Sequence, residues 1–62
     1  MSAEEALARA EELMARLEDV RARLEQTDDP DAALDLLGEI ANLARDIQAE
    51  IERAKGETDA TA

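Results

Sequence analysis

Apolar residues recur at intervals of three and four along most of this chain, and the pattern is clearest in residues 4–24. This stretch consists of three near-copies of one seven-residue unit: EEALARA, EELMARL and EDVRARL. A seven-residue period with apolar positions three and four apart is typical of a helix that packs lengthwise against other helices. The pattern therefore predicts an all-α protein of coiled-coil type.

The first helix is expected over about residues 3–27. Ser2 and Glu5 have the spacing of a capping box, in which the serine hydroxyl accepts the Glu5 amide and the Glu5 carboxylate reaches back to the Ser2 amide. Leu7 and Met14 widen the apolar surface of this helix on one side. Its main apolar row is predicted to be Ala3, Ala6, Ala10, Leu13, Leu17, Val20 and Leu24.

Residues 28–30 are expected to turn the chain. Pro30 has no amide hydrogen and disfavours helix at the residue before it, so the first helix cannot run through it. Proline suits the first position of a new helix, and Asp29 is the predicted N-cap. Asp28, Asp29 and Asp31 also form an acidic cluster, but their spacing does not match a calcium-binding loop. Helix capping is therefore the favoured role of these aspartates.

A second helix is expected over about residues 31–55, with Gly56 as its C-terminal stop. Residues 57–62 are small and polar and are expected to form a disordered tail. Two helices of similar length joined by a short turn fold back on each other, so residues 1–56 are predicted to form one antiparallel helical hairpin. The apolar row of the second helix is predicted to be Ala33, Leu37, Ile40, Ala44, Ile47, Ile51 and Ala54.

The apolar surface is too wide for a single hairpin to cover. With 62 residues the chain is also at the size where one core is marginal. We therefore expect self-association, most simply a homodimer that forms a four-helix bundle, with a leftover stripe of Leu34, Leu36 and Leu43. The expected core and interface residues are Leu7, Leu13, Met14, Leu17, Val20, Leu24, Leu34, Leu36, Leu37, Ile40, Leu43, Ile47 and Ile51.

The net charge of the chain bears on whether it binds nucleic acids or membranes directly. It carries 17 acidic against 7 basic residues, a net charge of −10. Such a surface repels nucleic-acid phosphates and anionic membranes, so neither is expected as a direct partner. No apolar run approaches the length of a membrane span, and the first residues lack the features of a signal peptide. We therefore expect a cytoplasmic protein.

The residue types needed for most active sites do not occur in this sequence. It has no His, Cys, Trp, Tyr or Phe, so a disulfide, a thiolate site and the usual nucleophile–base pairs are excluded. Neighbouring acids such as Glu4 and Glu5 fall on the solvent side of the heptad pattern, whereas acid–base catalysis needs a pocket that shields such groups from water. No catalytic, cofactor-binding or metal-binding residues are predicted, and the chain is not expected to be an enzyme.

From Ala10 to Ala54 the chain resembles the small subunit of bacterial exodeoxyribonuclease VII. The resemblance lies in Glu11-Glu12, Leu17-Glu18, Leu24-Glu25, an acidic turn with Pro30, Ala33-Leu34, Leu43-Ala44-Arg45, Gln48 and Ala54. It implies a non-catalytic helical hairpin that packs on a large subunit, which degrades single-stranded DNA.

Two function classes follow from the sequence. The first is a self-associating helical bundle with a structural or scaffolding role. The second is an accessory subunit that docks on a larger helical protein, such as a nuclease large subunit.

Overall fold

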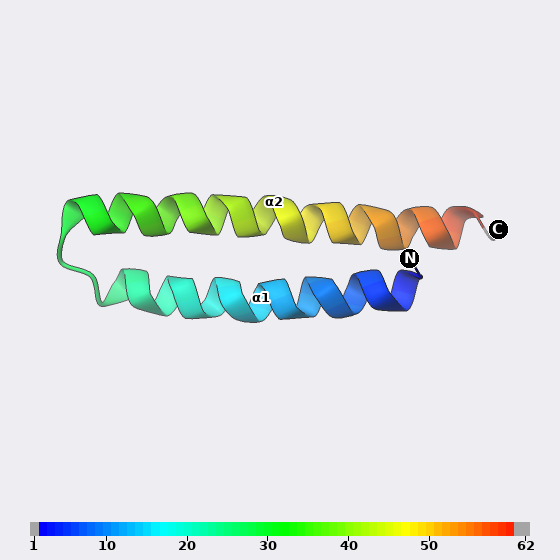
Figure 1. The fold of residues 1–62 in the computed structure, drawn as a ribbon, viewed down its shortest axis with the longest axis horizontal. Coiled ribbons are helices and arrows are strands. Elements are labelled where there is room, and N and C mark those ends of the chain that lie inside the picture. Colours follow the sequence, from blue (N-terminus) through cyan, green and yellow to red (C-terminus); the bar gives the residue numbers. More distant parts are fainter. Residues whose placement is uncertain (1, 61–62) are drawn as a thin grey trace.

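The computed structural model describes residues 2–60, and the side chains of residues 2–56. Helix α1 (Ala3–Glu25) and helix α2 (Pro30–Ala60) lie side by side and run in opposite directions (Figure 1). The described residues contain no strand. The predicted all-α antiparallel hairpin is confirmed.

Helix α1 begins with the cap that the sequence predicts. Ser2 has extended backbone angles, and its hydroxyl accepts a hydrogen bond from the Glu5 amide at 3.1 Å. The second bond of the capping box was expected to run from the Ser2 amide to the Glu5 carboxylate. In the structure the Glu5 carboxylate instead accepts a hydrogen bond from the Ser2 hydroxyl at 3.2 Å. One free amide at the helix start is thus satisfied by a local side chain.

Helix α1 ends at Glu25, two residues before the predicted limit at residue 27. The Thr27 amide bonds to the carbonyl of Leu24, three residues back, at 3.2 Å. The Thr27 hydroxyl donates to the carbonyl of Arg23 at 2.6 Å, which is the carbonyl that a continuing helix would offer to the Thr27 amide. A side chain therefore takes over a backbone role, and the turn spans residues 26–29.

Helix α2 begins at Pro30, one residue before the expected start at about residue 31, with the proline in the first helical position as predicted. The Asp29 carboxylate accepts the Asp31 amide at 3.2 Å, and the Asp29 carbonyl accepts the Ala33 amide at 2.9 Å. Asp29 is therefore the N-cap, and Asp31 adds negative charge in the first turn, where it is favourable.

The prediction that helix α2 ends at residue 55 is wrong. The helix continues through Gly56 to Ala60, so the expected disordered tail is helical as far as residue 60. Residues 61 and 62 lie outside the described residues. A glycine stops a helix by adopting a positive φ angle, and no glycine in the described part of the chain does so. Gly56 therefore continues the helix and does not stop it.

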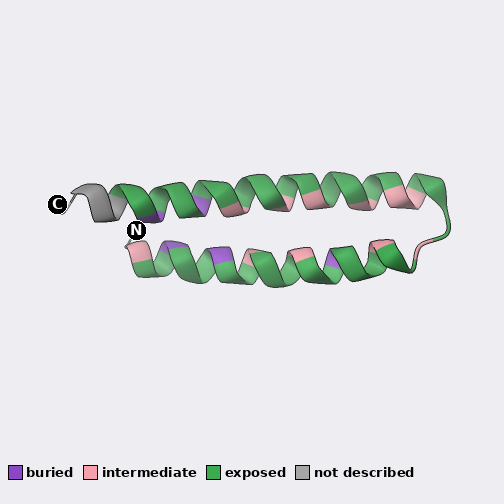
Figure 2. Ribbon diagram, turned by 180° about the vertical axis from the view of Figure 1, so that it is seen from behind, coloured by how far each residue is buried: buried purple, intermediate pink, exposed green. Residues whose placement is uncertain are grey.

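The seam between the helices follows the predicted row on α1 and a different row on α2 (Figure 2). On α1 the buried or half-buried residues are Ala3, Ala6, Ala10, Leu13, Leu17, Val20 and Leu24. On α2 they are Ala33, Leu36, Ile40, Leu43, Ile47, Glu50 and Ala54, with Ala32 half-buried beside them. Leu36 and Leu43 therefore belong to the seam and not to a leftover stripe, which corrects the predicted row.

The α2 sequence allows two rows with the same three-and-four spacing. Both contain Ala33, Ile40, Ile47 and Ala54, and they differ in the positions between these residues. The observed row places the bulky Leu36 and Leu43 in the seam, where the predicted row would place Leu37 and Ala44. It also places Glu50 in the seam where the predicted row has Ile51, although burial of a carboxylate is costly.

Replacement of Gly38 by alanine should stabilise the fold. Gly38 is exposed inside α2, and an added methyl group would meet no atom within 4 Å. Alanine is favoured over glycine in a helix interior by about 1 kcal/mol, which should raise the midpoint of thermal unfolding by roughly 4–8 °C in a domain of this size. Circular dichroism at one fixed protein concentration measures this shift. A lower midpoint would mean that another chain packs closely at Gly38.

Candidate functional site: two contrasting faces of the hairpin

One face of the hairpin is charged and joins the two helices through Glu50. The Nε atom of Arg9 on α1 lies 3.3 Å from Oε2 of Glu50 on α2. Arg53 donates a hydrogen bond from Nη1 to the same oxygen at 2.8 Å. Arg9 and Glu50 therefore lie at about the same position along the hairpin axis, and we call two such residues level. Because the helices are antiparallel, residue n of α1 is level with about residue 59 − n of α2.

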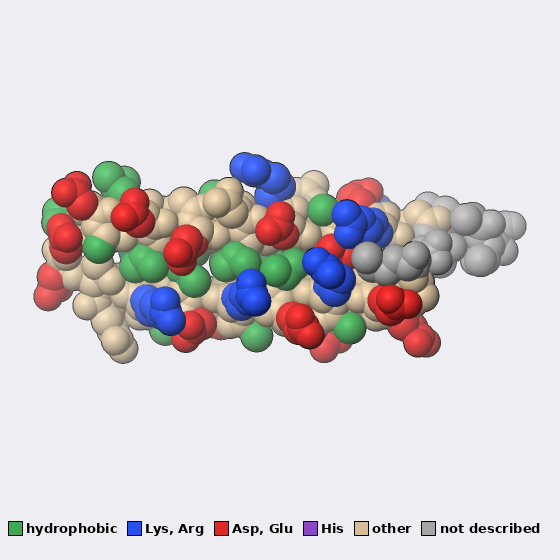
Figure 3. Space-filling model, viewed as in Figure 1, with side chains coloured by type: hydrophobic (Ala, Val, Ile, Leu, Met, Phe, Trp, Pro, Cys, Tyr) green, Lys and Arg blue, Asp and Glu red, His purple; other side chains and the backbone are tan. Residues whose placement is uncertain are grey.

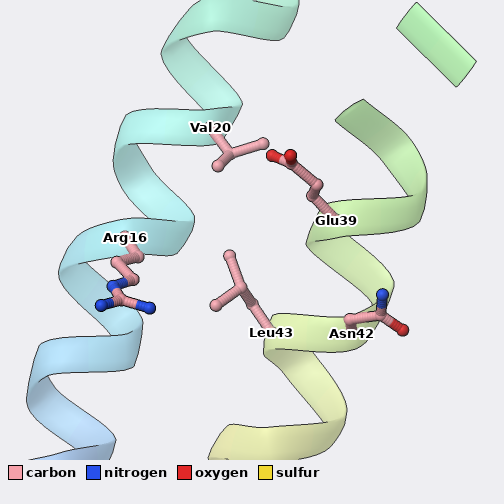
Figure 4. A pocket seen from close by; sticks show the side chains of 5 residues that line it. All are labelled: Arg16, Val20, Glu39, Asn42 and Leu43. Carbon is pink, nitrogen blue, oxygen red and sulfur yellow. The ribbon is translucent and has the colours of Figure 1, made fainter. Parts of the chain in front are cut away.

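The same face carries an open hollow of about 290 Å³ lined by Arg16, Val20, Glu39, Asn42 and Leu43. Figure 4 shows Val20 and Leu43 between the two helices, with Arg16 of α1 and Glu39 of α2 at the border. The hollow holds no enclosed polar cluster and is a gap between side chains over the seam.

A second hollow of about 260 Å³ brings together Arg9, Asp46 and Arg53, among others. The two hollows and the ion pairs therefore place one row from each helix on the same side of the seam. We call this side the charged face: Arg9 and Arg16 of α1, and Glu39, Asp46 and Arg53 of α2. On the face seen in Figure 3, Lys and Arg side chains stand among Asp and Glu along both helices, with hydrophobic side chains between them.

An apolar row lies on the other flank of each helix. Two residues along an α-helix correspond to a rotation of about 200°. Leu7 and Met14 precede Arg9 and Arg16 by two residues, and the α2 residues at 37, 44 and 51 precede those at 39, 46 and 53 in the same way. Since the charged rows share one side of the seam, these residues share the opposite side. We call this side the apolar face: Leu7, Met14, Leu37, Ala44 and Ile51.

The apolar face has no partner within the hairpin. Four of its side chains are large and strongly exposed: Leu7 by 48%, Met14 by 44%, Leu37 by 49% and Ile51 by 40%. Leu34, one turn before Leu37, is exposed by 66% at its edge. The other eight large residues predicted for core or interface lie in the seam: Leu13, Leu17, Val20, Leu24, Leu36, Ile40, Leu43 and Ile47.

Arg21 continues the row of Leu7 and Met14 but is held at the rim of the apolar face. Its guanidinium contacts Glu18 at 3.0 Å and Glu25 at 2.9 Å. The hydrogen bond to Glu18, together with the charges of Glu18 and Glu25, raises the pKa of the Arg21 guanidinium above its usual value. Arg21 therefore stays charged, and its positive charge is directed toward acids of its own helix.

The sequence did not predict that Glu50 would be a buried charged residue of the seam. Glu50 is 4% exposed between the alanines at the open end of the hairpin, and its Oε1 atom is buried without a hydrogen-bond partner. Both of its cationic partners are mainly solvent-exposed, so the carboxylate is buried and the arginines are not. The available signal was Arg9, which lies one residue before the seam position Ala10 and so can reach a carboxylate in the facing helix.

The hairpin presents one apolar face, which can serve as a contact surface, and one charged face with ion pairs. Among the described residues there is no group of three or more acids placed to hold a metal ion. In the same part of the chain, neither helix has an apolar stretch that could cross a membrane. The chain matches no protein-family model, no curated protein and no solved structure.

Removal of both arginines around Glu50 should destabilise the hairpin. In the Arg9→Ala, Arg53→Ala double variant, a buried carboxylate loses both ionic partners. A buried polar group left unsatisfied costs about 1–3 kcal/mol, which urea unfolding followed by circular dichroism measures.

The matched control adds Glu50→Leu to that double variant. Replacement of a buried ion pair by a well-packed apolar side chain is often neutral or stabilising. The triple variant should therefore recover the stability that the double variant loses. If the double variant unfolds at the same urea concentration as the unaltered chain, the Glu50 carboxylate does not depend on its arginines.

Proposed function

We propose that this chain is a non-catalytic helix-packing module that self-associates through its apolar face into a four-helix bundle. The observation that carries the proposal is the burial pattern of the hairpin. Among the residues whose side chains the structure describes, no large side chain is fully buried, and five large apolar side chains are at least 40% exposed. A hairpin of this kind has a seam without an enclosed core.

A second copy is the occupant that fits this face. Between Cα positions the hairpin is 49 Å long and 14 Å wide, which suits a standard interface of about 800 Å² per partner. The apolar face is itself a row of heptad positions, so another helical hairpin presents matching ridges. The charged face, with its ion pairs, stays in water on the outside of the bundle.

The role of such a bundle is structural or scaffolding. The sequence has no His, Cys or aromatic residue, so the usual nucleophile–base and transition-metal chemistry does not support catalysis by the chain. Its net charge of −10 opposes binding to phosphate backbones and to anionic lipid. Presentation of helices to other helices is the activity that this surface supports.

Polar substitution of the apolar face should separate the copies. In a variant with Leu7, Met14, Leu37 and Ile51 all changed to Gln, the dimer loses its apolar contact area. Each large apolar side chain contributes about 1.5–3 kcal/mol when fully buried. We expect the dissociation constant, measured by sedimentation equilibrium, to rise at least ~100-fold, which corresponds to ~2.7 kcal/mol.

The control variant carries Gln at four exposed positions of the outward row: Ala8, Ala15, Ala22 and Arg45. It should remain a dimer with little change in dissociation constant. If the apolar-face variant also remains a dimer, a different face joins the copies.

The alternative occupant is a larger helical protein, such as the nuclease large subunit that the sequence resemblance implies. It would use the same apolar face. A chain that sediments as a folded monomer at micromolar concentration would contradict self-association and would favour this accessory-subunit function.

A further inference from the structure

The apolar face has two edges of unlike charge. Beside Leu7 and Met14, three or four residues away on the side remote from the seam, lies an acidic edge: Glu4, Glu11, Glu18 and Glu25. Beside Leu37, Ala44 and Ile51, the equivalent positions form an edge without acidic residues: Leu34, Ala41, Gln48 and Lys55. We call it the neutral edge because Lys55, at its end, is its one charged residue. The acidic edge belongs to α1 and the neutral edge to α2.

The charges of the acidic edge are only partly balanced within the hairpin. Arg21 bridges Glu18 and Glu25, so one positive charge serves two carboxylates. Glu4 and Glu11 are exposed, and no ion pair involving either is found among the described residues. The α1 edge is therefore negative along its whole length, and the α2 edge ends in the positive charge of Lys55.

Two hairpins can stack face to face with twofold symmetry in two ways. If the axis runs parallel to the helices, α1 of one copy lies over α2 of the other, and both turns are at the same end. If the axis runs across the helices, α1 lies over α1 and α2 over α2, and the turns are at opposite ends. In both arrangements the facing helices of the two copies run antiparallel, so helix direction alone does not distinguish the arrangements.

We propose that two copies stack with α1 of each over α2 of the other, so that both turns lie at the same end of the bundle. This inference rests on the proposed function and specifies its geometry. In this arrangement each acidic edge borders a neutral edge, whereas the other arrangement places two acidic edges side by side. Like charges at close range repel, so the pattern of edges selects the first arrangement.

The positions of the residues along the hairpin axis agree with the stacking of α1 over α2. Arg9 lies level with Glu50, and by the same count Glu4 lies level with Lys55. Rotation about an axis parallel to the helices keeps every residue at its own level. Lys55 of each copy therefore comes next to Glu4 of the other. Met14 falls opposite Ala44 of the second copy, so a large side chain meets a small one near the middle of the interface.

Distances between identical labels on the two copies distinguish the arrangements. The chain has no cysteine, so the Asp28→Cys variant takes one spin label in the exposed turn. With both turns at one end the labels lie within about 30 Å, since neighbouring helix axes are about 8–10 Å apart. With turns at opposite ends they lie about 35 Å or more apart, the length of the 23 residues of α1 at ~1.5 Å each.

The control label is at Ala15→Cys, near the middle of α1 and exposed. It gives a short distance in both arrangements and so shows that pairs of labels are detected by pulsed electron resonance. Short distances at both positions are the expected result. A long distance at residue 28 with a short one at residue 15, or a mixture at residue 28, overturns the stacking and leaves self-association intact. Absence of any pair distance, with a monomer mass in sedimentation, overturns the stacking together with the proposed function.

Discussion

The contact between two helices along a single seam is the constraint on which the rest of this structure depends. A helix that faces one neighbour buries a narrow row of side chains, whereas both helices here carry apolar residues on a wider arc. The seam takes Leu13, Leu17 and Val20 from α1, and it leaves Leu7 and Met14 in water beside them. The half-buried core and the exposed apolar face both follow from this division, and they are the basis of the proposed self-association.

The two sides of the seam differ in where their charged residues lie. On one side Arg9 of α1 and Arg53 of α2 both pair with the Glu50 carboxylate. On the other side the charges stand at the outer edges and leave the middle apolar. Exposed ion pairs contribute little to stability, typically 0–1 kcal/mol. In the proposed dimer, their main effect is on which surfaces approach one another.

Most of the fold could be predicted from the sequence because its signals are local. Ser2 and Pro30 mark the helix starts, and the α1 row is easy to recognise because arginines border it on one side, although Leu7 and Met14 widen it on the other. The α2 row was ambiguous, since Leu36 and Leu37 both fit the spacing and only packing against α1 distinguishes them. The burial of Glu50 depends on Arg9 from the other helix, and no pattern within α2 reveals that contact. For the candidate site, the sequence predicts Leu7, Met14, Leu34, Leu37 and Ile51 as core or interface positions, but only the structure separates these exposed residues from the seam.

The central claim is that one hairpin leaves its apolar surface incomplete and that a second copy completes it. The most direct measurement is the midpoint of thermal unfolding as a function of protein concentration, followed by the helical signal in circular dichroism. Association stabilises the folded state by mass action, so the midpoint should rise steadily as the concentration is raised from micromolar to millimolar. A fully helical chain whose unfolding midpoint is the same at every concentration would contradict the account.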